Sequence, residues 1–155
     1  MSAPDPCIPA VEAAERFFAA VRARDHDGLW DLLSEGARAY VVNLAIERGM
    51  NFDAASRIRQ GTAGEDERRE YLVALLEGIL HDLRGVDLQR LAYEPRVQPA
   101  DHPRVHVEYL LPMEVAIGDV TPAIPAGSLV IVGEDGLWKV DHLVPRPGSR
   151  DGSHR

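Results

Sequence analysis

The sequence predicts an α+β domain in which N-terminal helices pack against a strongly curved antiparallel sheet of about four strands. Over roughly the first half of the chain, apolar residues recur every three to four positions, which is the period of an amphipathic helix. After Gly85 they recur at every second position, the period of a strand with one buried face. Helices followed by a run of strands are typical of helices packed on one face of an antiparallel sheet.

The first helices are marked by their caps. Residues 9–24 have one apolar face, and the break that follows contains Asp25, His26 and Asp27. We expect Asp25 or Asp27 to cap a short second helix that begins near Leu29, because a carboxylate accepts hydrogen bonds from the free N–H groups of a first turn.

Three more helical segments are expected before Gly85. Residues 36–49 have a helical apolar face, although the alternation within them also fits a strand. Asn51 is expected to cap the next helix, which ends near Gly61. Residues 65–84 are predicted to be the longest helix, because leucine and isoleucine form a continuous stripe along them.

The strands are expected over residues 86–93, 105–117, 128–132 and 137–144. The second would be long, and Pro112 cannot donate to a strand ladder, so a bulge, bend or edge position is expected there. Residues 118–127 are predicted to be a loop, and residues 133–136 a hairpin turn. In the last strand, the alternation places Trp138 and His142 on the same face.

Length and charge limit the kind of protein. A chain of 155 residues fits one domain, which we place at residues 9–145 between flexible tails at 1–8 and 146–155. The formal net charge of −8 without a basic stripe argues against a nucleic-acid partner. Apolar runs are too short to cross a bilayer, and no secretory leader is visible, so a cytoplasmic protein without a membrane partner is expected.

Several kinds of site are not expected. Cys7 is the single cysteine, which excludes an internal disulfide and a cysteine-based zinc site. Phosphate-binding glycine motifs and a nucleophile elbow are absent from the sequence. We therefore expect no nucleotide cofactor and no nucleophilic catalysis. Lys139 is the single lysine beside many arginines, a bias of GC-rich coding that suggests a bacterial source.

Two segments resemble the nuclear-transport-factor-2-like superfamily. They are residues 13–34 (AAERFFAAVRARDHDGLWDLLS) and residues 136–143 (GLWKVDHL), together about a fifth of the chain. The resemblance implies a cone-shaped fold with a cavity at its wide end and, frequently, a homodimer through the outer sheet face. The helical character of residues 36–60 makes this a divergent, helix-rich variant.

The superfamily includes ketosteroid isomerase, scytalone dehydratase and limonene epoxide hydrolase, together with members that only bind ligands or partners. Membership alone selects none of these activities. Isomerases of this kind typically present a tyrosine hydroxyl from the first helix, where this chain has Phe17 and Phe18. Phenylalanine cannot donate that hydrogen bond, which counts against such an isomerase.

His142 is the candidate catalytic residue, because strand alternation would point its ionisable imidazole toward a cavity wall beside Trp138. The alternative is a partly buried histidine bonded to backbone, since the sequence suggests no partner base. His106 and Glu108 have a spacing that a metal ion could use, but they alternate with the apolar row and should point away from the cavity. Residues 25–27 fit turn and cap chemistry better than metal binding, so no metal site is expected.

A small apolar or amphipathic ligand is the expected partner. Its candidate lining residues lie at apolar positions of the first helix and the strands, and they are Tyr109, Met113, Trp138 and Phe18. We weigh three functions: a ligand-binding domain without chemistry of its own, a small-molecule isomerase, dehydratase or hydrolase that uses His142, and a dimeric interaction module with a filled core.

Overall fold

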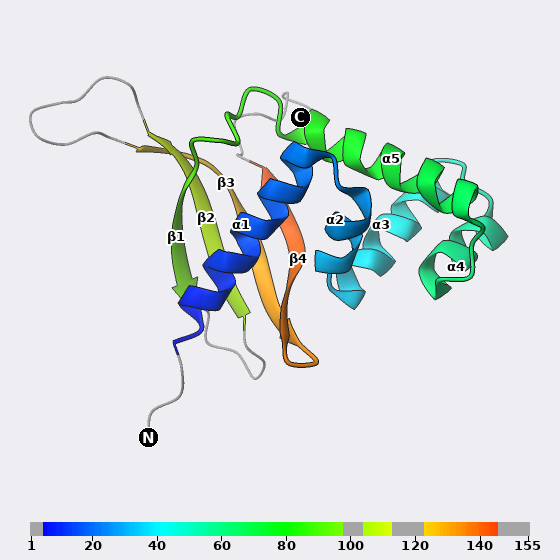
Figure 1. The fold of residues 1–155 in the computed structure, drawn as a ribbon, viewed down its shortest axis with the longest axis horizontal. Coiled ribbons are helices and arrows are strands. Elements are labelled where there is room, and N and C mark those ends of the chain that lie inside the picture. Colours follow the sequence, from blue (N-terminus) through cyan, green and yellow to red (C-terminus); the bar gives the residue numbers. More distant parts are fainter. Residues whose placement is uncertain (1–4, 98–103, 113–122, 146–155) are drawn as a thin grey trace, which may run out of the picture.

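The computed structural model describes residues 5–97, 104–112 and 123–145. Within them, five helices precede four strands, as Figure 1 shows. The helices are α1 (Cys7–Ala23), α2 (His26–Leu32), α3 (Glu35–Glu47), α4 (Phe52–Gln60) and α5 (Glu65–Asp82). The strands are β1 (Ala92–Val97), β2 (Arg104–Pro112), β3 (Ala123–Glu134) and β4 (Leu137–Pro145).

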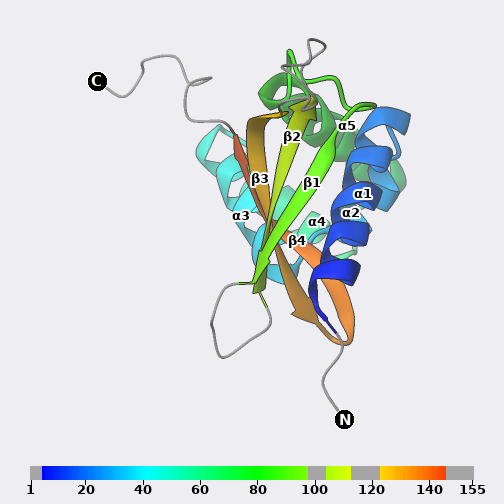
Figure 2. The same ribbon diagram turned by 90° about the vertical axis from the view of Figure 1, so that its left-hand side faces the viewer.

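The four strands form one antiparallel sheet in the order β1-β2-β3-β4. Helix α1 packs across all four strands. Helices α2 to α5 gather beyond the β4 edge of the sheet, and Figure 2 shows α1 and α3 on opposite sides of it. The predicted α+β class is therefore confirmed.

Alternation along β2 defines the two faces of the sheet. Val105, Val107 and Tyr109 are fully buried, and the ring of Tyr109 contacts Phe18 on α1. We call this the inner face. His106 and Glu108 alternate with these residues on the outer face and are only half-buried. The core thus lies between α1 and the inner face, and it continues among the helices, where Trp30 and Leu72 are buried in the same cluster.

The helix caps are those predicted from the sequence. Asp25 accepts a hydrogen bond from the N–H of Gly28 at 3.0 Å and caps α2. Asn51 accepts from the N–H of Ala54 at 3.1 Å and caps α4, which ends at Gly61 with a φ of 78°. The helical prediction for residues 36–60 is confirmed by α3 and α4.

The strand boundaries differ from the prediction in two places. Strand β1 begins at Ala92 and continues through Pro95, because an edge strand has a free side on which a missing N–H costs no ladder bond. Strand β3 begins at Ala123, so the second half of the predicted loop is strand.

The sequence predicts a bulge, a bend or an edge position at Pro112. Strand β1 pairs with β2 no further than Leu110, so Pro112 lies at an edge on that side of β2, and the bulge lies earlier in the strand. The register of β2 against β3 shifts between Tyr109 and Leu110, and the extra residue is Ala126 on β3. Residues 113–117 of the predicted long strand fall outside the described residues, as do residues 1–4 and the predicted tail at 146–155. Helix α1 begins at Cys7, so it includes the last two residues of the tail predicted at 1–8. None of the helices in the described part of the chain combines the length and apolar character needed to span a bilayer.

Candidate functional site

Aromatic side chains gather where α1 crosses strands β1 and β2. The ring centroids of Phe18 and Tyr109 are 4.9 Å apart in an edge-to-face arrangement, and those of Phe17 and Phe18 are 5.2 Å apart. Tyr93 lies directly opposite Tyr109 in the sheet, and its ring is 6.2 Å from that of Phe18. The structure therefore brings together two of the four predicted lining residues, Phe18 and Tyr109.

The hydroxyl of Tyr109 is the polar group of this cluster. Tyr109 has 0% exposure, and its hydroxyl has no hydrogen-bond partner among the described residues. Gly127, opposite Tyr109 on β3, makes room for it, because a Cβ at Gly127 would collide with this hydroxyl. Burial, with the Asp82 carboxylate at the end of α5, raises the pKa of Tyr109 well above its ordinary value. The phenol is therefore neutral at physiological pH.

A second buried phenol lies among the helices. The Tyr71 hydroxyl on α5 also lacks a hydrogen-bond partner within the described part of the chain, and burial raises the pKa of Tyr71 to about 12. Its ring packs edge-on against Trp30 of α2 at 5.8 Å. The Arg38 guanidinium lies 5.2 Å from the Trp30 ring centroid and donates to the Trp30 carbonyl. Sequence analysis did not single out Tyr71, because it lies beside the leucine stripe of its helix.

The other two predicted lining residues are not part of this cluster. Trp138 is half-buried and pairs with Gly133 near the hairpin, whereas Tyr109 pairs with Gly127 on the same strand β3. Six residues of extended strand separate those two partners by roughly 20 Å. Met113 lies outside the described residues.

His142 lies on the outer face. Val130 pairs with His142, while the next residue of β3, Ile131, pairs with Val140. Asp141 is therefore an extra residue, a β-bulge, which reverses the alternation of all that follows it. The His142 side chain is 52% exposed, whereas Val140 is 2% exposed. The expected placement of His142 on the same face as Trp138 and Val140 is therefore wrong.

Asp141 is the centre of a polar cluster on the outer face. The Ser34 hydroxyl donates to its Oδ1 at 2.6 Å and accepts from the N–H of Ala37 at 3.0 Å. Arg104 on β2 donates to Oδ2 at 3.3 Å, and the Nε2 of His142 lies 3.4 Å from the same oxygen. With a side chain only 15% exposed, Asp141 joins the start of α3 to the sheet. Its role as a bulge residue was not visible in the sequence.

The same cluster contains a serine, a histidine and an aspartate, the residue types of a catalytic triad. His142 has a carboxylate partner, and the Tyr40 ring of α3 packs edge-on against its imidazole at 6.4 Å. The Ser34 hydroxyl, which is buried, donates to Asp141 and not to His142. A serine that is not bonded to the histidine is not activated by it, so these residues do not form a nucleophilic triad.

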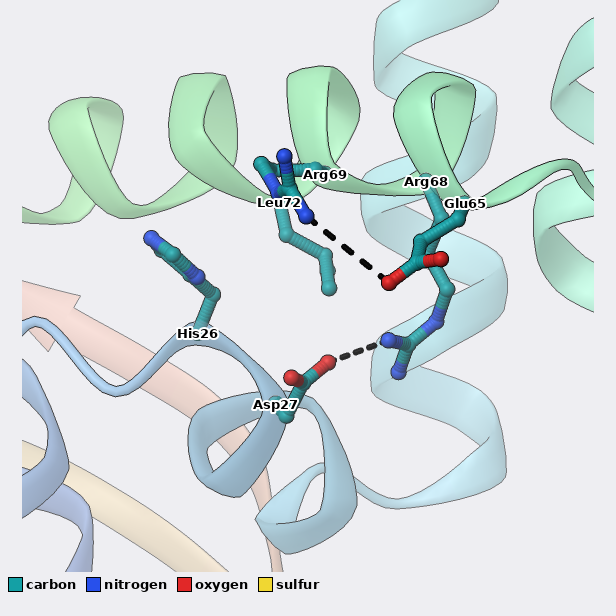
Figure 3. Close-up of a pocket in the computed structure, with 6 residues that line it drawn as sticks. All are labelled: His26, Asp27, Glu65, Arg68, Arg69 and Leu72. Carbon is teal, nitrogen blue, oxygen red and sulfur yellow. Dashed lines mark hydrogen bonds and ion pairs between the residues drawn. The ribbon is translucent and has the colours of Figure 1, made fainter.

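A small notch of about 80 Å³ lies between α2 and α5 (Figure 3). Its lining residues are His26, Asp27, Glu65, Arg68, Arg69 and Leu72. Arg68 pairs with Asp27, and Arg69 pairs with Glu65 at 3.8 Å, so the two positive and two negative groups neutralise one another. No cluster of three or more metal-ligating side chains occurs within the residues that the structure describes.

No protein-family model, no curated protein and no solved structure matches this chain.

Proposed function

We propose that the chain is a small-molecule-binding domain, without chemistry of its own, whose ligand lies against Phe18 and Tyr109 on the inner face of the sheet. The observation that carries this proposal is the Tyr109 hydroxyl, which is fully buried and has no hydrogen-bond partner among the described residues.

The free-energy cost of the unpaired Tyr109 hydroxyl supports a bound ligand as its hydrogen-bond partner. A buried polar group without a hydrogen bond costs about 1 to 3 kcal/mol, and most buried hydroxyls in proteins are therefore paired. The surroundings of Tyr109 are aromatic and apolar, like the walls of many small-molecule sites. A bound molecule that pairs with the hydroxyl removes this cost.

We further propose that the chain is a divergent member of the nuclear-transport-factor-2-like superfamily. The support is the order of its elements, with helices first and an antiparallel sheet after them, and the packing of α1 across all four strands. In a cone of this kind, the ligand would lie on the face that α1 covers, which is the face that carries Tyr109.

We do not propose catalysis by His142 at this site. His142 shares a row of paired residues with Val130 and His106 on the outer face, whereas Tyr109 lies on the inner face. An acid or base must lie within hydrogen-bond reach of the reacting group, and a ligand at Tyr109 would be separated from His142 by the sheet.

Native mass spectrometry and NMR test the proposal together. We expect gently purified protein to carry an adduct that is lost on denaturation, or else to bind Nile red, a neutral apolar dye, in a one-to-one complex. The dye should shift the amide resonances of Phe18, Tyr109 and Gly127 most strongly. The proposal fails if neither adduct nor dye binds, or if the shifts concentrate around His106 and His142. Failure to bind would favour the alternative of an interaction module with a filled core.

We also propose a homodimer through the outer sheet face, as the resemblance implies. Glu108 lies on that face, as does Arg96 on the neighbouring strand, which is 3.8 Å from Glu94 in the same chain. A two-fold axis can bring Arg96 of one copy near Glu108 of the other. Light scattering after gel filtration should give twice the chain mass. Glu108→Arg should shift the protein toward the monomer, while Glu12→Arg on an exposed position of α1 should not. A monomer at every concentration would refute the dimer.

A further inference from the structure

We propose that residues 83–91 form a strap over the aromatic cluster of the inner face, and that this strap opens to let a ligand reach Tyr109. The strap joins the end of α5 to the start of β1, and a hydrogen bond from Arg22 of α1 holds it closed. This inference rests on the proposed function, because it assigns an entry route to the same site.

The Tyr109 hydroxyl is closed off in this structure. Tyr109 has 0% exposure, and the space over Gly127 is filled by the hydroxyl itself and by the carbonyl oxygen of Val144. Phe18 covers the Tyr109 ring from α1. Protein interiors are close-packed, so a molecule can reach this hydroxyl only if a covering segment moves.

The strap has the composition of a cover. Its apolar side chains pack against the core, and they are Leu83, Val86, Leu88 and Leu91. The residues between them are polar or glycine, and all of these are exposed. Figure 1 shows the strap passing the C-terminal end of α1 on its way from α5 to β1. Moving it would therefore uncover the core at that end of α1.

The hydrogen bond that holds the strap lies beside the aromatic cluster. The Nη1 of Arg22 donates to the carbonyl of Leu88 at 3.1 Å. Arg22 follows Phe18 by four residues on α1, which places both on the same face of the helix. At the other end of the strap, Leu91 lies two residues before Tyr93, whose ring is 6.2 Å from that of Phe18. The strap thus runs alongside the rings that line the proposed site.

The backbone of the strap can move without breaking a strand ladder. The N–H of Val86 donates to the carbonyl of Leu83 at 3.0 Å. The N–H of Arg90 donates to that of Asp87 at 3.1 Å, so both hydrogen bonds lie within the strap. Gly85 has a φ of 84°, and a Cβ there would meet nothing within 4 Å, so the chain can turn at this position. Connecting segments of this kind open at a lower free energy than core strands.

Nitration by tetranitromethane measures the opening without any ligand, because the reagent modifies tyrosine rings that become accessible. Mass spectrometry of the peptides gives the rate at each tyrosine. We expect Arg22→Ala to raise the nitration rate of Tyr109 about tenfold, the effect of losing one hydrogen bond from a charged group. Tyr71 packs against Trp30 of α2 and not under the strap, so its rate should stay unchanged.

The matched control is Arg24→Ala, which removes an arginine from the same end of α1. The Arg24 guanidinium pairs with Glu77 of α5 at 2.6 Å and leaves the strap untouched. This variant should not change either nitration rate. Equal acceleration at Tyr71 and Tyr109 in Arg22→Ala, or no acceleration at Tyr109, would overturn the inference.

Stopped-flow mixing with Nile red then connects the strap to the proposed function. If the dye binds, Arg22→Ala should speed both its association and its release by about tenfold. The Kd should stay the same, because the hydrogen bond is lost from the closed protein with and without the dye. Unchanged rates would overturn the inference and leave the proposed function intact. If the dye does not bind, the proposed function falls and the nitration rates alone decide whether the strap opens.

Discussion

At the scale of single residues, two buried tyrosine hydroxyls are energetically unfavourable in this core. Tyr71 and Tyr109 bury hydroxyls that have no partner among the described residues. In ligand-free protein, Tyr71→Phe and Tyr109→Phe should each raise the free energy of unfolding by about 1 kcal/mol, because the replacement removes an unpaired polar atom and keeps the ring. Urea titration measures the change. A fall in stability would mean that the hydroxyl is paired, for example with a buried water.

Gly127 and Gly61 give a matched pair of substitutions. Both have a positive φ, 152° and 78°. A Cβ at Gly61 meets nothing within 4 Å, whereas one at Gly127 collides with Tyr109 and lies 2.7 Å from the Val144 carbonyl oxygen. We expect Gly61→Ala to cost about 1 to 2 kcal/mol and Gly127→Ala about 3 kcal/mol or more, because overpacking adds to the backbone strain. Equal costs in thermal unfolding would show that the core around Tyr109 yields easily.

The candidate site was predictable where it depends on alternation alone. Tyr109 lies in an unbroken row of apolar residues on β2, so its burial followed from the period of the strand. His142 lies after a bulge, and a bulge changes which face a residue occupies without leaving a mark in the apolar pattern. Only the pairing of β4 with β3 reveals it.

Among the elements, α3 depends on one carboxylate for its attachment to the sheet. Asp141 accepts from Ser34, the N-cap of α3, and from Arg104 on β2. We expect Asp141→Ala to lower the free energy of unfolding by about 2 kcal/mol, since charged hydrogen bonds are lost and Arg104 keeps an unpaired charge. Amide hydrogen exchange at Ala37, which donates to Ser34, should become faster.

The control for this substitution is Glu12→Ala, which removes a carboxylate from an exposed position on α1. It should change stability little, because surface charges contribute little to folding. Equal effects of the two substitutions would show that Asp141 does not anchor α3.

Helices were predicted more accurately than strands, and the reason is local chemistry. Asp25, Asn51 and Gly61 determine helix ends through bonds and backbone angles within a few residues. The start of β1 depends instead on which residues β2 offers for pairing, since Ala92 pairs with Leu110. The strand was predicted to end before Pro95, but a proline is accepted in a strand at the edge of a sheet. That β1 is an edge strand is a property of the whole fold.

At the scale of the whole molecule, the two buried phenols make the free energy of unfolding depend on pH in the alkaline range. Burial raises the pKa of Tyr71 to about 12 and that of Tyr109 further still, whereas an unfolded tyrosine ionises near pH 10. Above pH 10 the unfolded chain therefore binds fewer protons than the folded one. The contribution of these two phenols to the free energy of unfolding should be constant below that pH and fall as the pH rises, by up to about 1.4 kcal/mol per pH unit for each phenol.

Urea titrations in alkaline buffers measure this dependence, and the ultraviolet absorbance of phenolate shows which rings ionise before unfolding. The double variant Tyr71→Phe, Tyr109→Phe should lose most of the slope. A wild-type protein whose stability does not fall above pH 10 would contradict the prediction.

The overall class was predictable because a change in apolar period divides the chain into a helical and a stranded half. The placement of the helices was not. Helix α1 covers the inner face, whereas α3 lies at the β4 edge, where its Tyr40 packs against His142 on the outer face. That choice depends on polar contacts such as Ser34 with Asp141, which link residues far apart in the sequence.

The bulge at Asp141 shifts the two-residue alternation of β4 by one position. Before the bulge, Trp138 and Val140 lie on the inner face. After it, Leu143 lies on the inner face, opposite the buried Leu129. A homologous chain that lacks one residue here would keep both halves of the strand apolar on the inside only if the deletion removed the bulge itself. Alignments of future relatives should therefore tolerate a one-residue gap at Asp141 and at few other positions of this strand.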